Sequence, residues 1–294
     1  MLSGLSARMP SVVAAPTAAS TPSIGKPAPN SGPKSQAVDS FAVARLRGSL
    51  PMGGSVAGTP VHALRSGAPT FALVDPTLLS ERTDIPLDGQ LAFRIDNVLT
   101  NAECNEIVRI SEGFGFSEAA PGISTPPGMR MNKSCHWLTD GSLMAAIYSR
   151  VGHLIPQELD GHALYPRLSH RMNMYKYDKD DVFNRHYDGS WPAYGLTGDG
   201  DRMEEWPGVH SKLSLLLYLK GVYDGVRGGS TELYSPAGRV QAVKPKKGSV
   251  LLFRHGNGPG SVIHKGNKVT SETPKYVARI NVMYESGGGK SAYL

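Results

Sequence analysis

The sequence predicts a mainly β domain, a β-sandwich or jelly roll with helices packed on its outside. Its 294 residues include 34 glycines and 22 prolines, which favour a turn-rich architecture over a helix bundle. Helical patterns come first in the ordered region, and a run of short strand patterns follows beyond residue 164. With 40% hydrophobic residues, the chain can bury a sizeable core.

Residues 1–70 are predicted to be a disordered tail, and residues 71–294 a single domain with its core at about 90–285. The tail is rich in Ser, Ala, Pro and Gly and lacks periodicity, so it cannot bury enough apolar surface to offset its ordering entropy. It opens MLSGLSARM and is poor in acids, which fits an organelle transit peptide as well as a plain linker. We therefore expect an intracellular protein, cytoplasmic or organellar.

The charge of the chain does not indicate a nucleic-acid partner. The net charge is +6, but residues 1–74 hold six basic residues and one acidic residue, so most of the excess belongs to the tail. A phosphate backbone requires clustered charge on a folded surface. Two cysteines are too few for a disulfide framework, and no apolar run is long enough for a membrane span.

The first half of the domain is predicted to hold one strand and two helices. A strand pattern at 93–99 leads into a helix after Thr100, because Thr100 and Glu103 have the spacing of a capping box. Residues 119–135 are predicted to be a loop, and a second helix is expected after Asp140 as its N-cap.

Strands are predicted for the second half. Residues 172–177 alternate like a strand with one buried face, whereas 212–219 form a nearly continuous apolar run, as in a strand covered on both faces. Residues 178–181 form a polar turn between the strand at 172–177 and His186. Further short strands are expected at 228–233, 239–243, 249–253, 261–264 and 275–284.

Three side chains in this half have the chemistry of a metal site. His186 and Asp188 are two residues apart, so an extended chain projects both from one face. His264 lies at the end of a predicted strand and supplies a second imidazole. Two histidines and one carboxylate form the facial triad that suits non-haem Fe(II) and leaves coordination positions open. Taken singly, each residue is equally well explained as part of a turn or loop.

The last predicted strand carries basic residues on one face. Lys275, Val277, Arg279 and Asn281 alternate with a wholly apolar set on the other face. An inward-facing cation is costly unless an anion pairs with it. A dicarboxylate bound beside the metal would be such an anion.

Taken together, the motifs resemble those of the Fe(II)/2-oxoglutarate-dependent dioxygenases, specifically their prolyl 4-hydroxylase-like branch. The resemblance covers roughly residues 90–285 and depends on the order of the motifs more than on the triad alone. The segments that carry it are 172–188, 213–219, 228–231, 245–253, 264–266 and 275–279.

The resemblance implies a double-stranded β-helix in which His186, Asp188 and His264 are the iron ligands. It places the distal carboxylate of 2-oxoglutarate on a basic side chain of the last strand. Lys275 is favoured, one residue further from His264 than is usual in the family, and Arg279 is the competitor because its fork grips a carboxylate bidentately. Tyr177 would add its hydroxyl.

The implied activity is hydroxylation of an unactivated C–H bond by dioxygen, with decarboxylation of 2-oxoglutarate to succinate. Ascorbate is a further candidate cofactor. The substrate stays open between a prolyl residue in a protein or peptide and a small molecule.

Two alternatives to this activity remain: a cupin-type metalloprotein that does not use 2-oxoglutarate, and a catalytically silent β-sandwich that binds a partner through residues 189–211. This long segment is interpreted either as a substrate-facing lid or as an inert surface excursion. His136 is interpreted as a packing residue and His255 as a residue of the pocket rim. Thr231, Arg130 and Asn132 are weaker candidates for the pocket.

Overall fold

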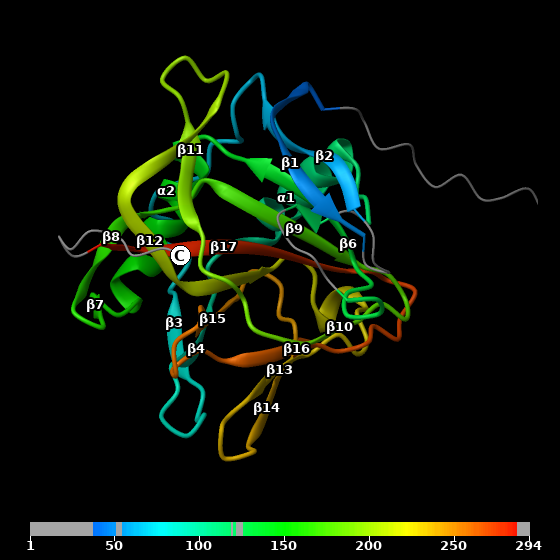
Figure 1. Cartoon of the computed structure of the whole chain (residues 1–294), viewed down its shortest axis with the longest axis vertical. Coiled ribbons are helices and arrows are strands. Elements are labelled where there is room, and N and C mark those ends of the chain that lie inside the picture. The colour runs from blue at the N-terminus through cyan, green and yellow to red at the C-terminus, as the bar shows by residue number, and fades with distance from the viewer. Residues whose placement is uncertain (1–37, 51–54, 119, 122–125, 287–294) are drawn as a thin grey trace, which may run out of the picture. The chain divides into compact units, whose positions relative to one another are not determined.

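The computed structural model describes residues 38–50, 55–118, 120–121 and 126–286. Its strands form two sheets that are traversed alternately by the chain (Figure 1). The large sheet has the order β3 (Glu81–Asp84), β4 (Ala92–Asp96), β15 (Val250–Arg254), β12 (Met203–Tyr218), β17 (Lys275–Glu285), β9 (Arg171–Tyr177), β6 (Lys133–Leu138), β2 (Ser55–Leu64), β1 (Ser40–Ser49) and β5 (Ala120–Pro121). β11 (Pro192–Leu196) pairs with β12, and β8 (His162–Leu168) pairs with β17 and with β7 (Glu158–Leu159).

The small sheet has the order β10 (Phe183–His186), β16 (Ile263–Gly266), β13 (Thr231–Tyr234) and β14 (Val240–Val243). From β9 onward the chain passes from the large sheet to the small one and back, so that β10, β13, β14 and β16 alternate with β12, β15 and β17. This winding is a double-stranded β-helix, and it confirms the predicted fold class. In the described residues no helix is long and apolar enough to cross a membrane.

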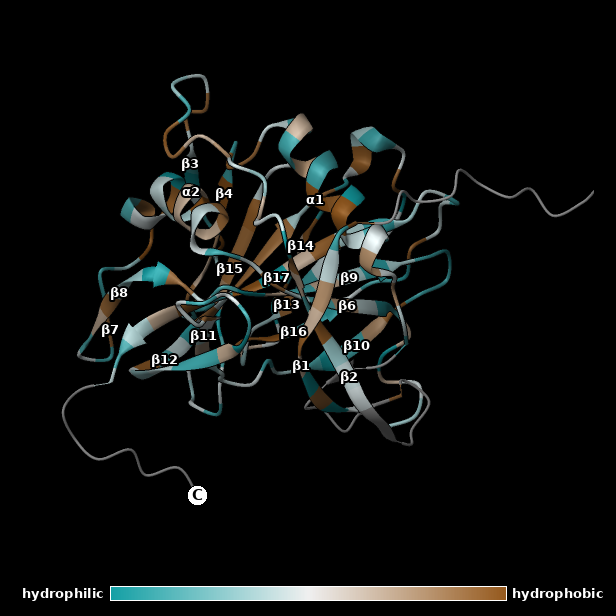
Figure 2. Ribbon diagram, turned by 90° about the horizontal axis from the view of Figure 1, so that it is seen from above, coloured by the Kyte–Doolittle hydropathy of each residue, from teal (hydrophilic) through white to brown (hydrophobic). Residues whose placement is uncertain are grey.

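Two helices cover the outer face of the large sheet. They are α1 (Asn101–Phe114) and α2 (Gly141–Val151), which is followed by the short 3₁₀ helix η1 (Gly152–Leu154); η2 (Val222–Asp224) lies in a later loop. Ile107 of α1 and Ile147 of α2 belong to one buried cluster with Ala278, Ile280 and Val282 of β17. Figure 2 shows hydrophobic segments gathered in the central strands, β15 among them. The opposite face of β17 therefore remains free to line a site between the sheets.

Both helix starts confirm the predicted caps. The Thr100 hydroxyl accepts the Glu103 backbone N–H at 3.2 Å, and the Glu103 carboxylate accepts the Thr100 N–H at 2.8 Å. Asp140 accepts the backbone N–H of Ser142 at 3.0 Å and so caps α2. Each bond satisfies an N–H that the helix itself leaves without a partner.

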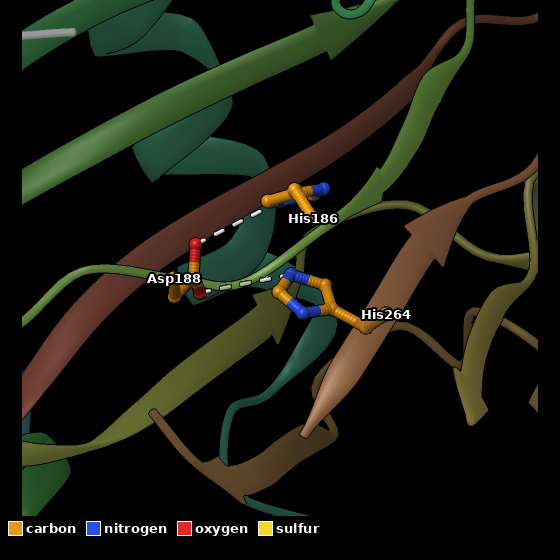
Figure 3. Close-up of side chains that lie close together, drawn as sticks. All are labelled: His186, Asp188 and His264. Atoms are coloured by element: carbon orange, nitrogen blue, oxygen red, sulfur yellow. Dashed lines mark ion pairs between the residues drawn. The ribbon is translucent and has the colours of Figure 1, made fainter. Parts of the chain in front are cut away.

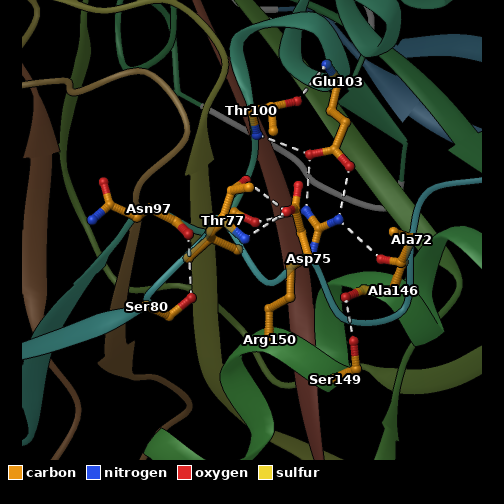
Figure 4. A network of polar contacts seen from close by, with 11 residues as sticks. Ala72, Asp75, Thr77, Ser80, Asn97, Thr100, Glu103, Ala146, Ser149 and Arg150 are labelled. Atoms are coloured by element: carbon orange, nitrogen blue, oxygen red, sulfur yellow. Dashed lines mark hydrogen bonds and ion pairs between the residues drawn. The ribbon is translucent and has the colours of Figure 1, made fainter.

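The same Glu103 ties the two helices together (Figure 4). The guanidinium of Arg150 on α2 donates to both oxygens of Glu103, at 2.7 and 2.8 Å, and also to the carbonyl of Val98 at 2.9 Å. The Arg150 side chain is only 3% exposed. Removing one partner of such a pair leaves the other buried and uncompensated.

We expect Glu103→Ala to lower the free energy of unfolding by about 3 kcal/mol, because it strands Arg150 and removes half of the capping box. Urea denaturation followed by circular dichroism measures the change. The control is Glu106→Ala on the same helix, whose ion pair with Arg109 is more exposed and is expected to contribute less than about 1 kcal/mol. Equal losses in the two variants would contradict a structural role for the Glu103–Arg150 pair.

The N-terminal boundary was predicted wrongly for the residues that the structure describes. Residues 40–49 and 55–64 form an antiparallel hairpin, β1 and β2, and β2 pairs in parallel with β6 through His62 and Trp137. Val61 and Ala63 are fully buried there. The hairpin buries these side chains only because it lies beside β6, so composition did not reveal it. Residues 1–37, and with them the transit-peptide prediction, lie outside the described residues.

Two other segments differ from the prediction. Residues 133–135, placed at the end of a loop, belong to strand β6, whose full length pairs with β9. The segment 189–211, predicted to be a loop, is largely strand: β11 and the first half of β12 form an antiparallel hairpin that extends the large sheet. Its Trp206 ring packs against His170 at 4.7 Å between ring centroids.

Candidate active site

His186, Asp188 and His264 converge between the two sheets (Figure 3). The Nε2 atom of His186 lies 3.7 Å from one oxygen of Asp188, and Nε2 of His264 lies 3.7 Å from the other. One ligand atom from each of the three residues falls within 4.8 Å of the others. The structure thus brings together two imidazole nitrogens and a carboxylate that lie up to 78 residues apart in the sequence.

Strand pairing explains why the two histidines meet. β10 and β16 are antiparallel neighbours in the small sheet, and His186 is the direct partner of His264 in their register. The rings are held from behind by aromatic side chains: Phe183 stacks on His186 at 3.6 Å, and Phe253 packs on His264 at 4.4 Å between centroids. Both imidazoles therefore have little freedom to turn away.

Hydrogen bonds leave the facing nitrogens of both rings available. Nδ1 of His186 lies 2.7 Å from the carbonyl oxygen of Asn184, and Nδ1 of His264 lies 3.3 Å from that of Val262. A carbonyl oxygen only accepts, so Nδ1 carries the proton in each ring and Nε2 keeps its lone pair. Burial lowers the pKa of His186 to about 3 and also lowers the pKa of His264, so both rings are neutral at pH 7. Neutral imidazoles of this tautomer are what a metal ion binds.

Asp188 is fixed in its ionised form. Burial opposes ionisation, but the Arg279 guanidinium, together with smaller contributions from His264, His186 and the Ser214 hydroxyl, outweighs it and holds the pKa of the Asp188 carboxyl well below its usual range. Nε of Arg279 lies 3.1 Å from Oδ2 of Asp188, and the hydroxyl of Ser214 donates to the same oxygen at 2.6 Å. Arg279 also donates to the carbonyl of Gly189 at 3.0 Å. The three donor groups therefore fit a divalent cation in number, protonation state and placement.

Ser214 and His255 support this carboxylate and were not predicted to do so. Nδ1 of His255 lies 2.9 Å from the Ser214 hydroxyl, and Nε2 of His255 lies 2.9 Å from that of Ser211. His255, expected at the pocket rim, is instead buried behind Asp188. A signal was present in the sequence: Ser214 is a polar residue inside the otherwise apolar run at 213–219.

Lys275 is a buried cation with no carboxylate partner among the described residues. Its ammonium donates to the carbonyl of Gly229 at 2.6 Å and lies 4.9 Å from the centre of the Tyr177 ring. Burial lowers its pKa to about 7. An ammonium group has three donors, so this side chain retains bonding capacity for an anionic ligand.

A cavity connects Lys275 with the three converging residues. It is lined from the large sheet by Lys275, Val277, Arg279, Tyr175, Tyr177 and Leu216, and from the small sheet and its flanks by Phe183, His186, Asp188, Thr231, His264 and Gly266. Lys275 and Tyr177 are cross-strand partners, so they stand side by side in its wall. His136 lies outside this lining, on β6, where it bonds with Asn173 at 3.0 Å. No residue of the 189–211 hairpin is part of the lining either.

Comparison with known proteins gives one match by sequence. Residues 172–283 match the model of the 2OG-Fe(II) oxygenase superfamily, a segment that includes His186, Asp188, His264, Lys275 and Arg279. No curated protein matches the chain by sequence.

Solved structures with similar folds include three prolyl hydroxylases. A viral collagen prolyl hydroxylase from Paramecium Bursaria Chlorella virus-1, in complex with 2OG, has 18% identity and a TM-score of 0.46, covering 68% of this chain and 99% of that one. A Pseudomonas putida prolyl-4-hydroxylase has 13% identity and a TM-score of 0.43, covering 68% and 95%. A Trichoplax adhaerens prolyl hydroxylase in complex with a hypoxia inducible factor peptide fragment has 17% identity and a TM-score of 0.45, covering 66% and 83%.

The sequence match spans the strands that build the cavity, from β9 to β17. Members of the matched family use Fe(II) and 2-oxoglutarate, and the two neutral imidazoles, the carboxylate and the buried lysine of this chain fit that pair. Residues 172–283 of this chain are therefore similar to the 2OG-Fe(II) oxygenase superfamily, whose members are 2-oxoglutarate-dependent dioxygenases.

Proposed function

We propose that this protein hydroxylates an unactivated C–H bond, with His186, Asp188 and His264 as iron ligands and Lys275 as the anchor of 2-oxoglutarate. The observation that carries the proposal is the convergence of three donor atoms within 4.8 Å at the wall of a cavity that also contains an unpaired buried lysine. A cupin-type protein without 2-oxoglutarate has no use for such a lysine, because burying a cation without an anion is costly.

Lys275, and not Arg279, is the better anchor for the distal carboxylate of 2-oxoglutarate. The Nε and Nη2 atoms of Arg279 are engaged with Asp188 and Gly189, so its fork is directed toward the carboxylate ligand. Lys275 has only a backbone carbonyl as its hydrogen-bond partner among the described residues. Tyr177 stands beside it in the cavity wall and is placed to add its hydroxyl.

The roles of the remaining side chains follow from these contacts. Iron and 2-oxoglutarate, when bound, supply the oxidising chemistry, in which 2-oxoglutarate is decarboxylated to succinate while dioxygen provides the hydroxyl oxygen. The protein orients the metal-binding side chains. Arg279 and Ser214 fix the Asp188 carboxylate, and Phe183 and Phe253 fix the planes of the two imidazole rings. The buried aromatic and aliphatic walls exclude water from the site.

Arg279 is expected to act on iron affinity through Asp188. Arg279→Gln should weaken iron binding by about tenfold to a hundredfold, the usual effect of losing a group that orients a metal ligand. The apparent KM for 2-oxoglutarate at saturating iron should change little. Anaerobic iron titration and steady-state kinetics separate the two effects, and a large rise in that KM with unchanged iron affinity would make Arg279 the anchor instead.

The substrate class proposed first is a prolyl residue in a peptide, with a small molecule as the alternative. The three similar structures described above are named as prolyl hydroxylases, one of them in complex with a peptide, which makes peptides the natural starting panel. Succinate release measured over prolyl peptides and small metabolites, with Fe(II) and ascorbate present, tests the proposal. Release no faster than in buffer across the panel, from protein that binds no iron, would favour the catalytically silent alternative.

A further inference from the structure

Two more guanidinium groups are buried on the inner side of the large sheet, those of Arg130 and Arg171. Arg130 is 2% exposed and Arg171 is 5% exposed. Neither forms an ion pair in the part of the chain that the structure describes, and every Asp and Glu of the sequence falls within that part. The other buried arginines there, Arg150 and Arg279, are paired with Glu103 and Asp188. Arg130 and Arg171 therefore lack a countercharge.

Their surroundings are aromatic, not anionic. The Arg171 guanidinium carbon lies 4.9 Å from the centre of the Trp191 ring and 5.9 Å from that of Tyr194, and its Nε is buried without a hydrogen-bond partner. Arg130 lies 5.1 Å from the ring centre of Tyr175; its Nε donates to Asn132, and its Nη2 is buried without a partner. Ring faces partly offset the charge but leave the in-plane N–H groups unsatisfied.

The position of Arg171 follows from strand alternation. Arg171, Asn173, Tyr175 and Tyr177 share one face of β9, and the last two line the cavity. Tyr177 is the partner of Lys275, so Arg171 stands six residues, or about 20 Å along the strand, from the proposed 2-oxoglutarate anchor. The two cationic groups consequently mark opposite ends of one polar face.

Arg130 belongs to the same cationic region. It precedes β6 and pairs with Phe183, a cavity residue, in an isolated bridge. His136 on β6 is hydrogen-bonded to Asn173 of β9. Burial, with smaller contributions from the charges of Arg171 and Arg130, lowers the pKa of His136 to about 3. A single imidazole thus lies within electrostatic range of both guanidinium groups.

We propose that Arg171, together with Arg130, binds a carboxylate of the substrate that is hydroxylated. The inference rests on the proposed function. In that function, Lys275 and the iron would neutralise the two carboxylates of 2-oxoglutarate, and Arg279 neutralises Asp188. Nothing in that centre neutralises the remaining two guanidinium groups. Arginine forks bind carboxylates bidentately, and a neutral substrate would leave both charges buried and unpaired.

The carboxylate has two sources of the same chemistry, the α-carboxylate of a small imino acid or an acidic side chain beside a prolyl residue in a peptide. Two matched probe pairs distinguish them. The first is N-acetyl-L-proline against N-acetyl-L-prolinamide, and the second is the capped peptide acetyl-Glu-Pro-Gly-amide against its Gln counterpart. Dissociation constants are measured calorimetrically on the full chain loaded with Mn(II) and 2-oxoglutarate, without dioxygen.

In at least one pair, the carboxylate probe should bind about tenfold to a hundredfold more tightly than the neutral probe. Arg171→Gln should abolish this preference while binding of 2-oxoglutarate is retained, which also shows that the variant is folded. Arg167→Gln, an exposed arginine on β8, is the matched control and should keep the preference. Equal affinities within both pairs, including no measurable binding of any probe, would overturn the inference.

Failure of the proposed function gives a different result. Wild-type protein that does not bind 2-oxoglutarate in the presence of Mn(II) contradicts the anchor at Lys275, before any substrate probe is added.

A second measurement distinguishes a binding role of Arg171 from a structural one. Because an unpaired buried cation is costly, Arg171→Gln should not lower the melting temperature of the unliganded protein. A lower melting temperature together with an undiminished carboxylate preference would make Arg171 structural.

Discussion

His186→Ala should abolish retention of iron and reduce succinate formation to the level of a buffer blank. The imidazole of His186 is one of the three donor groups whose ligand atoms lie within 4.8 Å, and alanine leaves only His264 and Asp188. Two donors are one fewer than the facial set of two histidines and a carboxylate that holds non-haem iron. Iron content after anaerobic loading and desalting, measured by mass spectrometry, gives the result directly.

His136→Ala is the matched control for this loss. His136 is also buried in the domain, and burial lowers its pKa to about 3. It lies on β6, where it hydrogen-bonds Asn173 of β9, and it is outside the cavity lining. It should retain one iron per chain. A second readout is thermal: a bound metal raises the melting temperature because it binds only the folded state, so Mn(II) should stabilise wild type and His136→Ala but not His186→Ala. Equal iron content in both variants would refute the ligand assignment.

Lys275→Gln should raise the KM for 2-oxoglutarate by about tenfold to a hundredfold. A hydrogen bond to a charged group contributes about 1.5–3 kcal/mol, which corresponds to this range. Iron affinity without 2-oxoglutarate should be unchanged, since the Lys275 ammonium donates its hydrogen bond to the carbonyl of Gly229 and not to a donor group of the proposed iron site. Anaerobic titration of iron and of 2-oxoglutarate, in that order, separates the two quantities.

Lys275→Arg is the informative companion variant. It keeps the positive charge, but the larger guanidinium must fit where Lys275 now contacts Gly229, whose φ of 64° and close approach leave little room. Partial recovery of 2-oxoglutarate affinity would support a charge-based anchor. An unchanged KM in Lys275→Gln would contradict the anchor and return the role to Arg279.

Local signals in the sequence predicted the parts of the fold that are determined locally. The Thr100–Glu103 capping box and the Asp140 cap are formed within one helical turn, and both are found. The apolar run at 213–219 is buried along its length because β12 is flanked by β15 and β17. The alternation of β17 likewise separates its core face from its cavity face.

Elements that depend on distant partners were missed. On β6, Cys135 and Trp137 pack into the core from one face, while Ser134 and His136 occupy the inner face. Because that inner face is polar, the sequence of β6 does not have the pattern of a buried strand. The hairpin of β1 and β2 is ordered by β6 in turn, so neither could be inferred without the other. Conformation that is stabilised by pairing across the sheet leaves little local trace.

The site shows the same division. The triad could be proposed from order and spacing, but the choice between Lys275 and Arg279 depends on which of them already has a carboxylate beside it. That information exists only in three dimensions, as does the support of Asp188 by Ser214 and His255. The unpaired state of Arg130 and Arg171 is likewise a property of the folded interior and not of any motif.

The most direct test of the central claim is a crystal structure of protein loaded anaerobically with Fe(II) and 2-oxoglutarate, with anomalous data collected at the iron edge. The account predicts one iron peak bounded by Nε2 of His186, Nε2 of His264 and the Asp188 carboxylate, with the distal carboxylate of 2-oxoglutarate on Lys275. An iron peak elsewhere, or a 2-oxoglutarate carboxylate held by Arg279 with Lys275 unengaged, would contradict it.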